Sequence, residues 1–406
     1  MLAMMTKLQN MIYGPIFFLL IFQRTGLTGL TLAAAGALTG FLGLNIEFVL
    51  TRNMDRVLSS LTENYDYFPW MSLNAFNLWW IVTGAKGMLT SDKLNIVGLL
   101  NAKTVGLLLF SSFYLFAMLR QFFDKKKTLQ SFLESLIIVN SAFFLFQTQS
   151  HDRYAFPLSV FLLLWAPYAI FPARHRYAQA FAGGYLLFTM FYSYNVHTAL
   201  IWNYPDNGLP IPTWPALTMI TSFVLLSLFG VFLTRLRYWV FPFAVTAIAI
   251  FILNLPLLQK RAINLTTYTP YISEQAYGER QINRSVQSSF GGSNGWTRLS
   301  VQYAFYKTGI GTHANSKHIY DINGHFKTLT TDFGIDTEAG PKGSAVFEIY
   351  GDDKLLFRSD KMGRFTLPKH AEVQISGVKY LTLITTDAGD GNYDDHTDWL
   401  NPMLWP

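Results

Sequence analysis

The sequence contains no cysteine, so no disulfide bond contributes to the stability of its fold. Charged residues are also scarce. They make up 14% of the 406 residues, whereas hydrophobic residues make up 51% and aromatic residues 16%. Soluble globular proteins carry about 25% charged residues, so this composition argues against an ordinary soluble protein. The absence of cysteine is consistent with a region outside the cell that needs no disulfide bonds, but this absence alone distinguishes few classes of protein.

Hydrophobic residues are concentrated in residues 1–258, and this region is predicted to be a polytopic α-helical membrane bundle. Several of its apolar segments approach the roughly 20 residues that a helix needs to cross a bilayer, although the first and fifth are short. The expected segments are residues 8–23, 28–50, 94–119, 129–147, 156–171, 177–198, 214–234 and 239–258.

Basic residues predict the orientation of this bundle. Three loops are rich in Lys and Arg, at residues 120–127, 172–176 and 235–237, and they alternate with loops that are poor in both. The positive-inside rule places the three basic loops in the cytoplasm. The other loops, at residues 51–93, 148–155 and 199–213, and everything after residue 258 are then expected outside the cytoplasm.

The same orientation places the first ten residues outside, although they contain neither a cleavage site nor a positively charged leader. A chain that begins outside, partway through a bundle, is expected to be the C-terminal part of a longer one.

The isoelectric point of about 9.2 is not a sign of nucleic-acid binding. Residues 259–406 carry nearly equal numbers of acidic and basic residues. The surplus of Lys and Arg therefore lies in the membrane half, in cytoplasmic loops beside lipid headgroups.

The long outer loop contains the stretch "YDYFPWMSLNAFNLWW", residues 65–80. One interpretation is an interfacial aromatic belt, because Trp and Tyr gather at the level of the lipid headgroups. The other interpretation rests on Asn74 and Asn77, which would share one face of a helix at a spacing of three residues. Together with Trp80, that face would meet a polar ligand at the membrane surface.

A second outer loop contains "HDRYAFP", residues 151–157. The planar guanidinium of Arg153 suits bidentate binding of a phosphate, and His151 can donate to an anion or exchange a proton. The alternative is a solvated cluster at a helix end, in which Asp152 pairs with Arg153 or its neighbours.

"HDRYAFP" resembles the His-Glu-Arg-Tyr-x-x-Pro signature of bacterial GT-C glycosyltransferases of the mannosyltransferase-like kind, which use polyprenyl-phosphate sugars. "NAFNLWW" (74–80) resembles the Asn-x-x-Asn-Leu-Trp segment of these enzymes, and "KLQNMIYGPIFFLLIF" (7–22) resembles their Lys-Pro-Gln-led helix. The resemblance implies that His151 and Arg153 bind the phosphate of the lipid-linked donor, and that the Asn74 to Trp80 loop faces donor or acceptor. It also implies a multi-pass protein of the bacterial cytoplasmic membrane that transfers sugar to a cell-envelope glycan.

Two departures from this family affect the expected activity. Asp152 stands where the family usually has Glu, and the catalytic aspartate of its first extracytoplasmic loop has no counterpart here. Catalytic residues therefore stay unassigned, and a separately encoded N-terminal GT-C half is an expected partner. The alternatives are a non-catalytic membrane anchor that displays a binding domain, and a transporter that uses the intramembrane Glu47 and Lys103.

The tail has a different sequence pattern. Residues 259–296 are polar and rich in Ser, Asn and Gly, and are predicted to be a linker. In residues 344–359 the side chains of Ala345, Phe347 and Ile349 alternate with more polar neighbours, and Gly351-Asp352-Asp353 supplies a turn. This period of two predicts that residues 297–406 form an all-β sandwich of the jelly-roll kind.

Two stretches of the tail, "GIGTHANS" (309–316) and "DAGDGNYDDHTDW" (387–399), resemble the signatures of the NPCBM domain. This carbohydrate-binding module was first described with glycoside hydrolase family 98, and the resemblance implies a glycan ligand outside the cell.

The residues of these stretches suit sugar recognition, which combines aromatic faces with polar groups that bond to ring hydroxyls. The predicted carbohydrate-binding residues are His313, Asn315, His396, Asp398 and Trp399. Asp387, Asp390 and Asp394 also form an oxygen-rich loop that suits Ca²⁺, the one cofactor that the sequence suggests. The alternative is a loop whose carboxylates bond to its own backbone.

Overall fold

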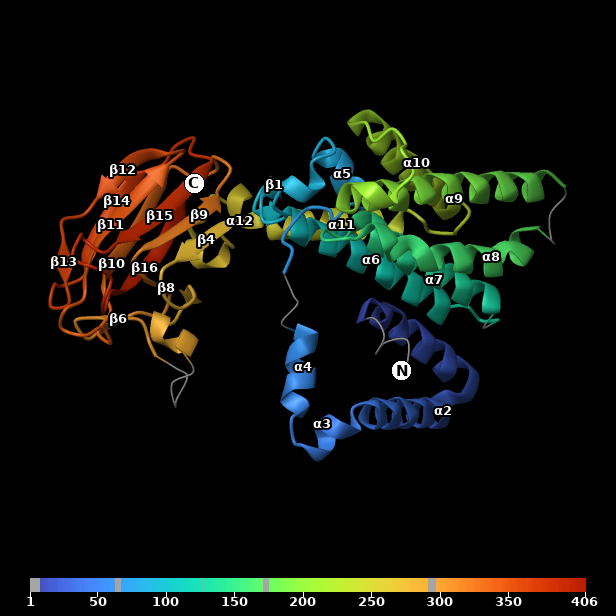
Figure 1. Ribbon diagram of the computed structural model, residues 1–406, viewed down its shortest axis with the longest axis horizontal. Helices are drawn as coiled ribbons and strands as arrows, with labels where there is room; N and C mark the ends of the chain where they lie inside the picture. Colours follow the sequence, from blue (N-terminus) through green and yellow to red (C-terminus); the bar gives the residue numbers. More distant parts are fainter. Residues whose placement is uncertain (1–7, 63–66, 127, 171–174, 291–296) are drawn as a thin grey trace. The chain divides into compact units, whose positions relative to one another are not determined.

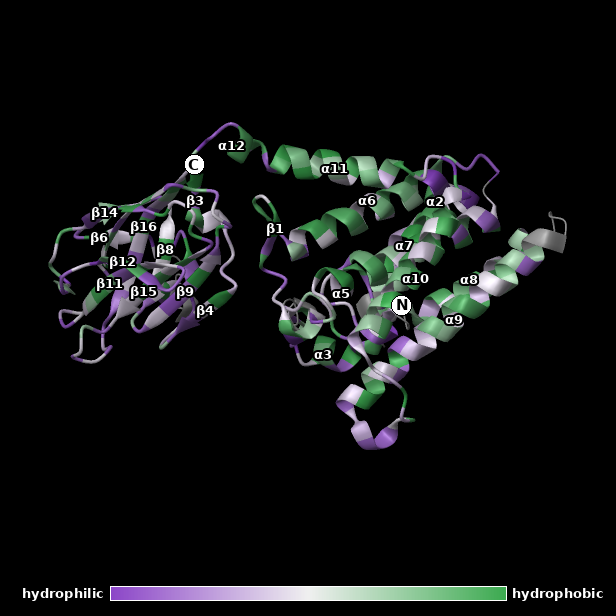
Figure 2. Cartoon of the chain, turned by 90° about the horizontal axis from the view of Figure 1, so that it is seen from above, coloured by the Kyte–Doolittle hydropathy of each residue, from purple (hydrophilic) through white to green (hydrophobic). Residues whose placement is uncertain are grey.

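The computed structural model describes residues 8–62, 67–126, 128–170, 175–290 and 297–406, which fall into two compact units (Figure 1). The helical unit consists of Met1–Asp92 and Lys103–Ala249, and the β unit consists of Lys93–Ala102 and Ile250–Pro406. Hydrophobic residues dominate the helices of the first unit, whereas hydrophobic and polar residues are mixed in the strands of the second (Figure 2).

Five helices are long and apolar enough to cross a membrane by length and composition: Asn10–Leu44, Ala102–Phe122, Leu129–Phe146, Asp152–Ile170 and Pro215–Thr234. The α-helices up to residue 253 are α2 (Gly14–Leu44), α3 (Ile46–Leu50), α4 (Met54–Thr62), α5 (Leu78–Val82), α6 (Ala102–Phe122), α7 (Leu129–Phe146), α8 (Phe156–Ile170), α9 (His175–Asn203), α10 (Pro215–Thr234) and α11 (Phe241–Leu253).

The first two predicted segments match the observed helices, and the third differs from them. The expected helices 8–23 and 28–50 correspond to two helical parts of α2 on either side of a sharp kink at Gly26, where φ is 69° and ψ is −160°, and α3 covers the last residues of the second segment. Glycine adopts this conformation without the strain that a Cβ atom causes. The expected helix 94–119 begins instead with a hairpin of β1 (Asn95–Val97) and β2 (Leu100–Asn101), and α6 starts at Ala102.

Helix α7 is the most buried long helix of its unit. It is mostly apolar and lies inside the bundle, where it packs against α8, α2 and α5. Its N-terminus is capped by Thr128, whose side chain accepts a hydrogen bond from the backbone N–H of Ser131. Its polar residues are paired: Glu134 bonds to Arg120, and Asn140 donates to the Tyr13 hydroxyl and to the Tyr154 carbonyl.

The β unit is a sandwich of two antiparallel sheets, as predicted. One sheet has the order β14-β10-β16-β8-β5 with β3 also paired to β16. The other has the order β12-β11-β15-β9-β4 with β13 (Met362–Gly363) paired to β11. The longer strands are β8 (Gly309–His313), β9 (Ser316–Asp321), β10 (Thr328–Ile335), β11 (Ser344–Gly351), β12 (Lys354–Arg358), β14 (Lys369–Gln374), β15 (Tyr380–Thr386) and β16 (His396–Trp405).

The described part of the predicted linker, residues 259–290, is not a linker, because it contributes strands to both sheets; residues 291–296 lie outside the described residues. β3 (Ile263–Asn264) pairs with β16, β4 (Ile272–Gln275) pairs with β9, and β5 (Gln281–Ile282) pairs with β8. A Cβ atom on Gly311 would lie 2.2 Å from the carbonyl oxygen of Arg284, so a signature glycine permits this close packing. The strands are two to four residues long, too short to produce an alternating pattern.

This arrangement predicts that a fragment of residues 259–406 is much more stable than the fragment 297–406. The shorter fragment lacks β3, β4 and β5 and also loses the buried side chains of Leu265 and Tyr268. Burial of one large apolar side chain contributes about 1.5–3 kcal/mol, so we expect several kcal/mol of difference. Urea unfolding followed by circular dichroism measures it, and equal midpoints for the two fragments would contradict the assignment of these strands.

Asp395 gives the β unit a pH-dependent stability. Its carboxylate is buried and accepts a hydrogen bond of 2.7 Å from the backbone N–H of Ser344. Burial, with the nearby charges of Asp390 and Asp387, raises the pKa of Asp395 to about 6. The folded-state pKa thus exceeds the unfolded value of about 3.9, so the stabilisation is fully present below pH 4 and is lost as the pH rises through 6.

Asp395→Asn should therefore remove part of the pH dependence. Relative to the variant, the wild-type 259–406 fragment should gain about 1–2 kcal/mol between pH 7.5 and pH 4, after allowance for solvent screening. Urea unfolding of both proteins across this range measures the difference. A constant difference in unfolding free energy at all pH values would contradict the elevated pKa.

Candidate functional site

Strand pairing brings the two signature stretches of the β unit together. β8 pairs with β16 so that His313 lies opposite His396, and the centroids of the two imidazole rings are 5.2 Å apart. The ring of Tyr277 lies 5.3 Å from that of His313 in an edge-to-face arrangement and is 53% exposed. Tyr277 belongs to the segment that the sequence predicted as a linker, so the sequence analysis did not identify it.

The hydrogen bonds of the two histidines determine what their rings offer to a ligand. His313 Nδ1 lies 2.6 Å from the carbonyl oxygen of Ala314, and this nitrogen must carry the proton because a carbonyl oxygen only accepts. Burial lowers the pKa of His313, which favours the neutral ring with an acceptor at Nε2. His396 Nδ1 lies 3.0 Å from a carboxylate oxygen of Glu338, which orients the second ring.

Asn315 and Asp387 join the loops that follow β8 and β15. The backbone N–H of Asp387 donates to Asn315 Oδ1 over 2.9 Å, and Asn315 Nδ2 donates to Asp387 Oδ2 over 3.2 Å. Asp387 Oδ1 also accepts from the N–H of Gly389 over 3.0 Å. The loop at residues 387–391 therefore uses its first carboxylate to hold its own backbone beside Asn315.

We define the histidine-pair site as Tyr277, His313, Asn315 and His396. Tyr277 and Asn315 are exposed and His396 is partly exposed, whereas His313 is buried, with 4% of it exposed. The other two residues that were predicted to bind carbohydrate lie in the interior of the sandwich. Trp399 is fully buried and packs against Phe333 and Phe347, with ring centroids 5.9 and 5.2 Å away. Asp398 is also fully buried, and desolvation with the neighbouring charge of Asp336 raises its pKa well above the usual value.

The burial of Asp398 and Trp399 follows from the position of their strand. β16 is a central strand of its sheet, with Trp399 in the core of the sandwich. Leu299 and Val301 pack on Leu400 in a separate cluster over the other face of the sheet. Asp398 and Trp399 therefore present no surface to a sugar ring.

Two of the three aspartates predicted to bind Ca²⁺, Asp387 and Asp390, make separate contacts. Asp390 pairs with Lys361 over 2.5 Å and accepts from the Ser344 hydroxyl over 2.9 Å, and these contacts lower its pKa. Asp387 bonds to Asn315, as described above. Across the described part of the chain, no group of three or more His, Asp or Glu side chains is arranged to hold a metal ion. The structure therefore does not place Asp387, Asp390 and Asp394 in one metal site.

In the helical unit, Asn74, Asn77 and Trp80 are buried and do not share a helical face. Asn74 has a positive φ of 60° and precedes α5, whereas Asn77 is the N-cap of α5. Asn77 donates to the carbonyls of Phe144 and Gln147, and Trp80 donates to the Thr218 hydroxyl. These side chains fix α5 to α7 and α10, so they act in packing.

The loop that contains His151 and Arg153 is held by buried hydrogen bonds. Asp92 accepts bonds from Thr148 and Gln149, and the N–H of Leu73 donates to the carbonyl of Ser150. His151 also forms isolated β-bridges with Leu73 and Asn74. The "NAFNLWW" and "HDRYAFP" stretches are thus neighbours in space.

Arg153 is the predicted phosphate ligand that reaches an open pocket. Its side chain is 54% exposed and lies 4.0 Å from Asp152. It lines a pocket of about 770 Å³. The polar residues that share this pocket are Asn10, Ser159, Tyr185, Thr189, Tyr192, Ser193 and His197. His151 is not among the described residues that line it, and the sequence analysis identified none of these polar neighbours, because they come from distant parts of the chain.

Comparison with known proteins gives matches in the β unit. Residues 261–405 match the family model described as NPCBM/NEW2 domain. The chain is 28% identical over 148 residues to alpha-1,3-galactosidase B of Akkermansia muciniphila, a match that covers 36% of this chain and only 17% of the relative.

Two solved structures from Clostridium perfringens are also similar. The first is the CBM51 of GH95 in complex with methyl-galactose, with 28% identity, a TM-score of 0.32, and coverage of 35% of this chain and 99% of that one. The second, the M60 catalytic domain of ZmpB with its two CBM51 domains, has 25% identity, a TM-score of 0.33, and coverage of 36% and 15%. By the family match, the C-terminal unit of this chain carries an NPCBM/NEW2 domain.

Proposed function

We propose that the β unit binds a glycan at the histidine-pair site, through its exposed residues Tyr277 and Asn315 and the histidine rings beside them. The observation that carries this proposal is the convergence of the two signature stretches, which places two histidine rings beside an exposed tyrosine. A sugar hydroxyl both donates and accepts, and His313 Nε2 and the Asn315 amide offer an acceptor and further polar groups. The ring of Tyr277 offers an apolar face to the C–H groups of a pyranose.

A galactoside is the first candidate for this glycan ligand. The NPCBM resemblance implies carbohydrate binding, and one relative of this domain is named alpha-1,3-galactosidase B. The family match covers the β unit alone, so it gives no evidence that this chain shares the catalytic activity of that relative.

Tyr277→Ala should weaken galactoside binding about tenfold, equivalent to about 1.4 kcal/mol. The matched control is Tyr303→Ala, because Tyr303 is also an exposed tyrosine of this unit, at 71%, and lies in the turn between β6 (Ser300–Val301) and β7 (Ala304–Phe305). Isothermal titration calorimetry with the intact protein in detergent measures both. Equal losses in the two variants, or no glycan binding by the wild type on an array, would overturn the proposal.

We further propose that the helical unit is a multi-pass membrane region with the β unit outside the cytoplasm. The five long apolar helices and the basic loops at residues 120–127 and 235–237 support this placement. Within it, the Arg153 pocket is the proposed site for the phosphate of a polyprenyl-phosphate sugar. The pocket combines an exposed guanidinium with several hydroxyl groups, which suits a phosphate joined to a sugar.

Sugar transfer from this donor to an envelope glycan is the enzymatic form of the proposal. Its supporting observation is that all three GT-C-like stretches contribute to one region. Asn140 links Tyr13 of the first stretch to Tyr154 of the third, and His151 bridges to Asn74 of the second. The alternative is a non-catalytic anchor that displays the glycan-binding domain. Release of labelled sugar from the donor distinguishes the two.

Arg153→Lys should weaken binding of a labelled polyprenyl-phosphate sugar about tenfold although the charge is kept, because an ammonium group does not reproduce the bidentate contact of guanidinium. Arg237→Lys is the matched control, since Arg237 lines a different pocket. Equilibrium binding to the protein in proteoliposomes measures both variants. If Arg153→Lys bound the donor as tightly as the wild type, the loop would be a solvated cluster and not a phosphate site.

A further inference from the structure

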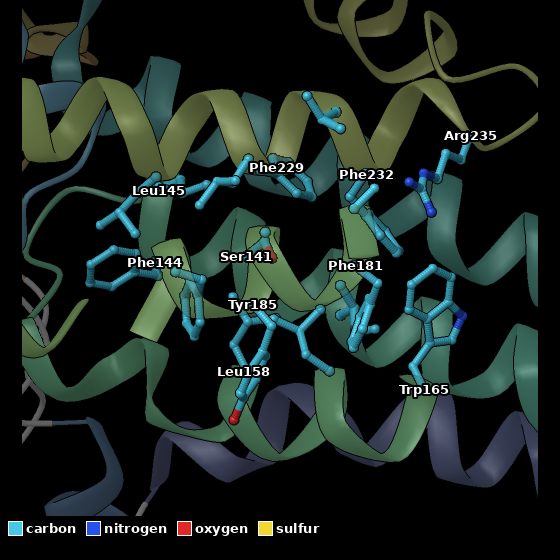
Figure 3. Close-up of a pocket in the computed structure, with 18 residues that line it drawn as sticks. Ser141, Phe144, Leu145, Leu158, Trp165, Phe181, Tyr185, Phe229, Phe232 and Arg235 are labelled. Atoms are coloured by element: carbon cyan, nitrogen blue, oxygen red, sulfur yellow. The ribbon is translucent and has the colours of Figure 1, made fainter. Parts of the chain in front are cut away.

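Helices α7, α8, α9 and α10 enclose a second pocket in the helical unit, with a volume of about 110 Å³ (Figure 3). Its lining is almost entirely aliphatic and aromatic. Phe144 and Leu145 lie toward one end of the pocket, and Trp165, Phe232 and Arg235 lie toward the other (Figure 3). The volume is a few times the roughly 30 Å³ that one water molecule occupies in the liquid, which suits a short stretch of alkyl chain.

Arg235 gives this pocket its only charge. It is the one ionised side chain among the described lining residues, and it is exposed. Within the part of the chain that the structure describes, its guanidinium has no hydrogen-bond or ion-pair partner. Glu134, a buried acid that accepts from Trp165 Nε1 over 3.3 Å, is paired with Arg120. A guanidinium at the end of an apolar pocket is complementary to an amphiphile with an anionic head.

We infer that this pocket binds one acyl chain of an anionic phospholipid, whose phosphate lies on Arg235. The guanidinium matches the geometry of a phosphate, and the apolar lining gains from the removal of a hydrocarbon chain from water. Arg235 belongs to the basic cluster 235–237, which we place in the cytoplasm, so the lipid comes from the inner leaflet. A lipid held between four helices stabilises their packing.

Tyr185 lines both this lipid site and the proposed donor site, but the two arginines lie at different places in the bundle. Arg153 precedes the first residue of α8, whereas Trp165, at the Arg235 end of the pocket, lies twelve residues further along the chain. That spacing corresponds to about 18 Å along a helix. The inference rests on the proposed membrane placement but not on sugar binding or transfer, so the Tyr277 and Arg153 assays can fail without affecting it.

Two adjacent glycines of α9 allow a matched test of the apolar part. A Cβ atom on Gly183 or on Gly184 would meet no atom within 4 Å, and Gly184 lines the pocket whereas Gly183 does not. Gly184→Leu therefore places four side-chain carbons in the space that the acyl chain would fill. Gly183→Leu makes the same change in composition outside the pocket.

The headgroup contact is tested by Arg235→Gln, with Arg237→Gln as its control. Arg237 lies over the ring of Tyr238, 4.7 Å from its centroid, and does not line this pocket. A zwitterionic headgroup also contains a phosphate, but its cation is repelled by the guanidinium. Arg235→Gln alone should therefore lose the preference for anionic over zwitterionic lipid. A general effect of net charge would reduce it equally in both variants.

The experiment is native mass spectrometry of the intact chain in mild detergent, titrated with phosphatidylglycerol or phosphatidylcholine of the same acyl length. The wild type and both control variants should bind phosphatidylglycerol about tenfold more tightly. Gly184→Leu should lose most binding of both lipids, and Arg235→Gln should bind both equally. Equal binding of the two lipids by the wild type, or identical behaviour of Gly183→Leu and Gly184→Leu, would overturn the inference.

Each variant is first compared with the wild type by circular dichroism, so that lost binding is not confused with lost folding. Inorganic phosphate at millimolar concentration is the competitor. It should leave phosphatidylglycerol binding within twofold of its original value, because free phosphate lacks the acyl chain. Complete displacement by inorganic phosphate would show that Arg235 is a simple anion site and would contradict a lipid site.

Discussion

The antiparallel pairing of β8 with β16 is the constraint on which the candidate site of the β unit depends. The two signature stretches begin 78 residues apart in the chain, and only this register places His313 opposite His396. The same pairing directs Trp399 into the core between Phe333 and Phe347. A shift of one residue would exchange the faces of β16, so core packing and the position of the histidines are fixed together.

The sequence was sufficient to predict an all-β sandwich, because the alternation in β11 and β15 reflects one buried and one less buried face. It was not sufficient to distinguish a surface tryptophan from a core tryptophan. Both faces of β16 are covered, so residue type at Asp398 and Trp399 carries no information about exposure. Of the five residues predicted to bind carbohydrate, His313, Asn315 and His396 lie together in the histidine-pair site, where His313 is buried. Tyr277 could be added only once the short strands β4 and β5 were known.

In the helical unit, hydrophobicity predicted the apolar segments but not the role of their polar residues. Asn77 and Asn140 each bond to groups on distant segments, as buried amides must when little water is present. Such contacts depend on tertiary structure, so the spacing of Asn74 and Asn77 suggested a ligand-binding face where the structure has a helix cap. Arg153 and Arg235 differ from these amides because each is exposed and each lines a pocket, which makes both suitable for anionic ligands.

The central claim, that the paired histidines face a glycan, is tested most directly by following the imidazole resonances of selectively labelled histidine in the 259–406 fragment during titration with a galactoside. The signals of His313 and His396 should shift together and saturate at one Kd. The signal of His370, which is held by Asp332 on another part of the sheet, should stay constant. Shifts confined to His370, or unchanged signals of His313 and His396 under conditions in which calorimetry detects binding, would contradict the account.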